Sequence, residues 1–113
     1  MKETKTEVKK AFKQILREAR KHDRRIRGSL RKEVLRKDSF LFTLTISQKT
    51  GLFSRSDLIK ILATLDFGEK QELRIVVHYL DKEASHKFQK IIFDHLYKIR
   101  SKLRVLIRER KDF

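Results

Sequence analysis

The sequence lacks three residue types that often decide how a chain folds. Its 113 residues include no cysteine, no proline and no tryptophan. The absence of cysteine excludes disulfides, thiolate metal sites and cysteine nucleophiles, and it is consistent with a reducing compartment. Average usage would supply about five or six prolines in a chain of this length. Because proline interrupts helices, its absence predicts long helices with few breaks.

Long apolar runs and targeting signals are also missing. No apolar run approaches the roughly 20 residues of a membrane span. The first ten residues, MKETKTEVKK, carry positive charge, but no apolar segment follows them, so they do not form a secretory signal. We therefore expect a soluble, cytoplasmic protein with no membrane partner.

Motifs that carry catalysis or hold cofactors are scarce. Only three glycines occur, far apart, so the sequence contains no Gly-rich phosphate loop and no GxSxG elbow. Asp81, Glu83 and His86 are close in sequence, but three residues without further ligands are typical of a chance surface cluster. The histidines have no metal-ligand spacing; they are His22, His78, His86 and His95. We expect no enzyme activity, catalytic residue, metal or cofactor.

Positive charge is abundant and unevenly distributed. The chain has 30 Lys and Arg against 15 Asp and Glu, a net charge of +15. The net charge is +10 for residues 1–37, zero for residues 38–97 and +5 for residues 98–113. We expect one domain, 1–113, with a basic N-terminal helical segment (1–37), a neutral core segment (38–97) and the basic end of a C-terminal helix (98–113). Such segregation is typical of nucleic-acid-binding proteins, although an acidic protein surface or anionic lipid would also attract the basic segments.

The N-terminal segment is predicted to be helical over residues 3–26, with a second helical piece over 30–37. Val8, Phe12 and Ile15 recur at the spacing of an apolar helix face. Beside this face lies a ladder of positively charged residues spaced four apart: Lys9, Lys13, Arg17, Lys21 and Arg25. Each such pair destabilises a helix by roughly 0.2–0.5 kcal/mol, so we expect an anion against the ladder. A solvated face is the alternative.

Arginines also cluster around Gly28, where the two helical pieces would meet. Arg24, Arg25, Arg27 and Arg31 form this cluster. Because arginine binds phosphate through two hydrogen bonds and stacks on bases, the cluster is a candidate phosphate contact. A polar helix junction is the alternative.

Two central stretches allow more than one interpretation. Residues 40–46 alternate apolar and polar side chains, which favours a strand, while a helix ending near Gly51 is the alternative. Residues 73–79 fit a strand face and a helix face equally well. A helix is expected to begin at Ser54 or Ser56 and to end at Gly68.

The last third of the chain is predicted to be one long helix over residues 84–111. Its apolar face repeats at spacings of three, four and seven and needs a large partner surface, which is either the rest of the chain or a second copy; a homodimer is favoured. The residues of this face are Phe88, Ile92, Leu96, Ile99, Leu103 and Leu106. Next to this face lie three further basic residues, Arg100, Arg104 and Arg108. The predicted fold class is mainly α, with long amphipathic helices at both ends around a small central unit and a possible two-stranded β element (40–46, 73–79).

The stretch 46–66 resembles the helix-turn-helix pattern of DNA-binding proteins. Ser47, Gly51 and Leu52 occupy its small, turn and apolar positions. The resemblance implies that Arg55, Ser56 and Lys60 face the major groove of DNA and that Lys49 lies against the sugar-phosphate backbone. A plain helix-loop-helix without a DNA role is the alternative.

The expected function is therefore a non-enzymatic nucleic-acid-binding protein with a regulatory or accessory role, with DNA favoured over RNA. The expected contacts are Lys9, Lys13, Arg17, Lys21, Arg24, Arg25, Arg27, Arg31, Lys49, Arg55, Ser56, Lys60, Arg100, Arg104 and Arg108. The alternative is a structural or adaptor subunit of a ribonucleoprotein or another multiprotein assembly.

Overall fold

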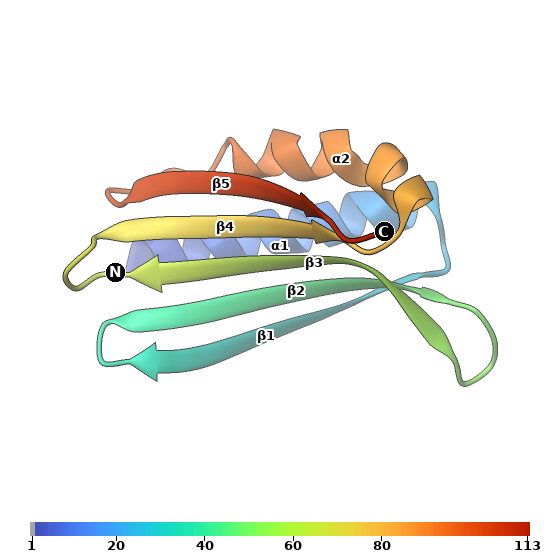
Figure 1. Ribbon diagram of the computed structural model, residues 1–113, viewed down its shortest axis with the longest axis horizontal. Coiled ribbons are helices and arrows are strands. Elements are labelled where there is room, and N and C mark those ends of the chain that lie inside the picture. The colour runs from blue at the N-terminus through green and yellow to red at the C-terminus, as the bar shows by residue number, and fades with distance from the viewer. Residues whose placement is uncertain (1) are drawn as a thin grey trace.

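The computed structural model describes residues 2–113 and has a mixed α/β architecture (Figure 1). The elements along the chain are α1 (Lys2–His22), β1 (Ile26–Arg36), β2 (Ser39–Lys49), β3 (Arg55–Asp66), β4 (Glu72–Tyr79), α2 (Lys82–Leu96) and β5 (Arg104–Lys111). The strands form one sheet in the order β1-β2-β3-β4-β5. Neighbouring strands are antiparallel, except that β4 and β5 are parallel.

The core lies between the sheet and the two helices. Along β2, β3 and β4, side chains alternate between buried and partly exposed, as expected for strands with one covered face. Phe42, Ile61 and Val77 lie at the centre of the covered face and are completely buried. Both helices pack on this face, and Figure 1 shows α1 behind the strands.

Helix α2 provides the crossover that a parallel strand pair requires. Such a pair cannot be joined by a tight turn, so the chain must pass over the sheet between β4 and β5. Asp81 begins this helix, since its carboxylate accepts a hydrogen bond from the backbone N–H of Ala84 at 2.9 Å. Phe88 and Ile92 then pack on the sheet with almost no exposed surface.

Helix α1 lies close to strand β1 because Gly28 has no side chain. A Cβ atom at Gly28 would collide with the side chain of Leu16. Phe12 and Ile15 of the same helix are fully buried against the sheet. On its other side, α1 meets α2 through Glu18 and His95, whose Oε1 and Nε2 atoms are 2.9 Å apart.

The predicted fold class is wrong, because three stretches predicted as helices are strands. Residues 30–37 belong mostly to β1, residues 54–67 contain the whole of β3, and the end of the predicted helix 84–111 is β5. The N-terminal helix is confirmed over most of its length, and so is the strand over 40–46. Residues 73–79, left open above, are a strand.

The prediction of one long C-terminal helix is wrong because apolar residues are so frequent there that they fit both the helical period and the strand period. Helix α2 ends at Leu96, and Val105 and Ile107 then alternate on the covered face of β5. Four residues of the predicted dimer face are buried in the chain's own core: Phe88, Ile92, Leu96 and Leu103. A second copy could reach them only if this core opened.

Candidate functional site

The sheet face opposite the helices is uncovered, and we call it the open face. Its side chains follow from the strand register, because directly paired residues point to the same side of a sheet. One row crosses all five strands and consists of Arg31, Thr43, Leu62, Val76 and Arg108. With strands about 4.8 Å apart, the arginines at its two ends are separated by about 19 Å. The row therefore has a charge at each edge and an uncharged centre.

The neighbouring row also carries two positive charges and adds a histidine. It consists of Ser29, Thr45, Lys60, His78 and Arg110. Neither row contains a carboxylate, although Lys60 and Arg110 contact Asp57 and Asp112 at 4.0 and 3.0 Å. Besides Asp57, which the register pairs with Ser47, three acidic residues of this face lie in the rows farther from the β2–β3 turn: Glu33, Asp66 and Glu72. The two rows farther from the turn thus have no net charge, whereas the rows of Arg31 and Lys60, nearer to it, carry two positive charges each.

More basic residues meet at that end of the sheet, where the chain leaves α1 and enters β1. The backbone N–H of Lys49 donates to the carbonyl of Arg25 at 2.9 Å, which joins the α1–β1 turn to the end of β2. The Arg27 guanidinium donates to the carbonyl of Arg24 at 2.8 Å. Lys49 is in turn paired with Arg55 across the hairpin. Five residues predicted as contacts therefore lie together: Arg24, Arg25, Arg27, Lys49 and Arg55.

Asp23 organises the α1–β1 turn. Its carboxylate accepts hydrogen bonds from the backbone N–H and the guanidinium of Arg25 and, at 2.8 Å, from the amide of Gln48. Lys87 of α2 lies 3.8 Å away. The backbone and side-chain hydrogen bonds from Arg25 hold the pKa of Asp23 well below its usual range. Asp23 therefore stays ionised and fixes the position of Arg25.

The ladder predicted on α1 lies on the opposite side of the sheet from the open face. Lys9, Lys13, Arg17 and Lys21 are exposed on the outer surface of the helix. Near them, the Lys5 ammonium lies 3.5 Å from the centre of the Phe40 ring. The pKa of Lys5 is lowered, first by burial and then by the like charges of Lys32 and Lys9. The predicted contacts thus fall on two separate basic surfaces.

The pattern that resembled a helix-turn-helix forms a β-hairpin. Residues 46–66 contain the end of β2, a turn and the whole of β3. Arg55 and Ser56 begin β3, and Lys60 lies on the open face. No recognition helix is present in this stretch. The expected docking of Arg55, Ser56 and Lys60 in a major groove as a helix is therefore wrong.

Two basic residues of the open face, Arg74 and Arg110, were missed by the sequence analysis. Arg74 lies on β4 and pairs with Glu72 at 2.8 Å, and Arg110 follows Arg108 by two residues on β5. The only local signal for Arg74 was the alternation of charged and apolar residues in 72–75, and Arg110 had no such signal. Arg100, which was predicted, lies instead in the loop before β5.

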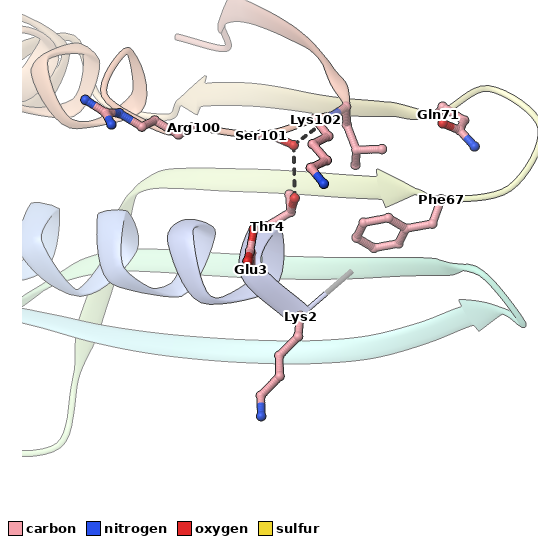
Figure 2. A pocket seen from close by; sticks show the side chains of 9 residues that line it. Lys2, Glu3, Thr4, Phe67, Gln71, Arg100, Ser101 and Lys102 are labelled. Carbon is pink, nitrogen blue, oxygen red and sulfur yellow. Dashed lines mark hydrogen bonds between the residues drawn. The ribbon is translucent and has the colours of Figure 1, made fainter.

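A hollow with a volume of about 760 Å³ lies at the other end of the molecule (Figure 2). Lys102 and the ring of Phe67 reach into it, while Lys2 and Arg100 point away. Its clearest polar contact joins the hydroxyls of Thr4 and Ser101 at 3.0 Å. This lining has one carboxylate, Glu3, and no histidine.

Two further observations concern the whole described chain. Within residues 2–113, no three His, Asp or Glu side chains are close enough together to hold a metal ion. Neither helix in this part of the chain has the length and apolar character needed to cross a bilayer. Comparison of the chain with protein-family models, with curated proteins and with solved structures finds no match.

Proposed function

We propose that the protein binds duplex nucleic acid through the open face, without catalysing a reaction. The observation that supports this most directly is the row from Arg31 to Arg108, in which arginines about 19 Å apart flank an uncharged centre. Arginine forms paired hydrogen bonds with phosphate, and a flat surface can contact two backbones at once. Counterion release would supply most of the affinity.

A duplex fits the open face better than a single strand does. Proteins that bind single strands stack bases on aromatic side chains. The phenylalanines and tyrosine of the strands, Phe40, Phe42 and Tyr79, are all buried on the helix side of the sheet. The earlier preference for DNA depended on the helix-turn-helix pattern, so the proposal covers duplex DNA and duplex RNA alike.

The adaptor interpretation remains the second candidate, because the centre of the open face is partly apolar. Leu41, Leu62 and Val76 lie there on β2, β3 and β4, and Leu106 lies beside them on the edge strand β5, each partly exposed. Interfaces between proteins commonly have an apolar centre and a polar rim. A partner of this class would have to carry acidic groups opposite Arg31 and Arg108.

Fluorescence anisotropy with labelled duplex DNA, duplex RNA and single-stranded DNA tests the proposal at about 50 and 200 mM salt. We expect duplex binding that weakens with salt at a log–log slope near −0.9 per phosphate contacted. Replacing Arg31 and Arg108 together by alanine should weaken binding to all duplex sequences alike and reduce the slope by about two.

The matched control is the pair Lys10→Ala and Lys90→Ala, which removes the same charge from exposed positions on the helices. We expect this pair to bind nearly as the wild type does. Equal losses in the two double variants would mean that diffuse charge, and not the open face, attracts the duplex. No salt-dependent binding by the wild type would contradict the proposal itself.

A further inference from the structure

The β2–β3 hairpin ends in two large apolar side chains that are largely exposed to solvent. We call residues 50–54 the hairpin tip. Phe53 is 100% exposed and Leu52 is 84% exposed, the highest values among the large apolar residues of the described chain, 2–113. Burying a side chain of this size is worth about 1.5–3 kcal/mol, so leaving two of them together in water is costly. Figure 1 shows that the hairpin projects beyond the rest of the sheet.

The hairpin tip is held in shape by its own hydrogen bonds. The backbone N–H of Thr50 donates to the carbonyl of Ser54 at 3.0 Å, and the Thr50 hydroxyl donates to the Ser54 hydroxyl at 3.0 Å. A Cβ atom at Gly51 would lie 2.9 Å from the Ser54 hydroxyl, so the turn is tight at this point. Leu52 and Phe53 therefore project from a closed loop, which lowers the entropy lost when they are inserted into a partner.

Cations stand at the base of the hairpin tip on both strands. Lys49 and Arg55 are directly paired across the hairpin, one on each side of the tip. Arg25 is linked to Lys49 through the backbone, which adds a third charge at the same end. An apolar tip with a cation on either side complements a partner that is apolar inside and anionic along its two edges. A base-pair step between two phosphate backbones has this arrangement.

We propose that the hairpin tip acts as a wedge that enters the minor groove and inserts Phe53, supported by Leu52, between adjacent base pairs. Proteins that insert apolar side chains in this way unstack one step and kink the duplex by 20–90°. Lys49 and Arg55 bind the phosphates beside the opened step. The inference rests on the proposed binding of duplex nucleic acid and adds to it a defined deformation.

Bending of a duplex with a donor and an acceptor dye at its ends measures this deformation by energy transfer. Wild-type protein should raise the transfer efficiency, and it should raise the fluorescence of 2-aminopurine placed at the kinked step. Phe53→Ser should abolish both signals and weaken duplex binding by about tenfold or more, the loss expected for a stacking contact. Phe53→Leu should keep part of the bending, because leucine also serves as a wedge.

The matched control is Phe113→Ala, which removes another exposed phenylalanine, 54% exposed, away from the hairpin. It should bend the duplex as the wild type does. Circular dichroism should show that Phe53→Ser is folded, because the side chain has no packing contacts to lose.

Four outcomes would overturn the wedge. Binding by the wild type without bending would leave the proposed function intact and remove only the wedge. Equal bending by Phe53→Ser and the wild type would do the same. Binding to phosphatidylserine vesicles that depends on Phe53, without any bending of DNA or RNA duplexes, would assign the tip to a membrane surface. No duplex binding at all would remove both proposals.

Discussion

At the scale of single residues, Asp23 has the densest polar surroundings near the candidate interface. Its side chain is only 9% exposed, and four groups from three parts of the chain approach it. The neighbouring Arg25 is itself 66% exposed and remains accessible to a ligand on its outer side. A buried carboxylate that fixes an exposed arginine is a common way to position a phosphate contact.

The depressed pKa of Asp23 makes its contribution to stability depend on pH. The pKa in the folded state lies below the unfolded value of about 3.9. The stabilisation is therefore fully present above about pH 4 and is lost as the pH falls toward the folded pKa. Asp23→Asn should melt below the wild type at pH 7, and the difference in Tm should narrow on acidification.

Melting followed by circular dichroism at neutral pH and near pH 3 checks this prediction. The control is Asp94→Asn on α2, where the carboxylate is exposed. A gap between Asp23→Asn and the wild type that stays constant with pH would show that the carboxylate is not the stabilising group.

At the scale of elements, the contact between α1 and β1 depends on a single missing side chain. Leu16 occupies the space above Gly28, so the helix can approach the edge strand closely. Gly28 has a negative φ, and its role is therefore to give space and not to permit a special backbone conformation. From the sequence, this glycine was expected to interrupt a helix, since an isolated glycine within a periodic apolar pattern is typical both of a helix interruption and of a close contact in a strand.

Gly28→Val should lower the free energy of unfolding by about 1–3 kcal/mol, because the new side chain displaces Leu16. The double variant Gly28→Val with Leu16→Ala should be more stable than the two single changes predict when their effects are added. Urea unfolding of the four proteins gives this coupling energy. Ser29→Val, on the exposed side of the same strand, serves as the control and should change stability little. Simple additivity would contradict the close packing.

The type of an element could be predicted from the sequence only where its apolar residues fitted the helical period or the strand period but not both. Residues 4–19 repeat at helical spacing and not at strand spacing, and α1 was predicted correctly. In 57–65 and 103–107, apolar residues are so frequent that both periods fit. There the choice was made by neighbouring strands, since β3 lies between β2 and β4 and satisfies its backbone groups on both sides.

At the scale of the whole molecule, the dominant feature is a net charge of +15 on a chain of 113 residues. Self-repulsion of this size opposes the compact state. The two basic surfaces lie on opposite sides of the sheet, so the strongest repulsion acts between charges within the same surface. Added salt screens this repulsion.

Added salt should therefore raise the Tm in the absence of any ligand. We expect a continuous rise between about 20 and 200 mM salt, where the screening length falls to a few times the spacing of neighbouring side chains. Sodium chloride and choline chloride should give equal rises, because screening depends on ionic strength alone. A Tm that stays constant or falls would show that ion pairs, and not repulsion, dominate the surface.

The sequence by itself determined the net charge, its concentration toward the two ends, the amphipathic helix α1 and the strand at 40–46, because these are local properties. It could not assign the open face, since Arg31 and Arg108 are neighbours only through three intervening strands. It could not decide whether the apolar residues of 88–103 pack against the sheet of the same chain or against a second copy, and the structure shows that they pack against their own sheet. Tertiary structure decided both, because pairing between distant strands and the burial of one sheet face are non-local and outweigh weak local preferences.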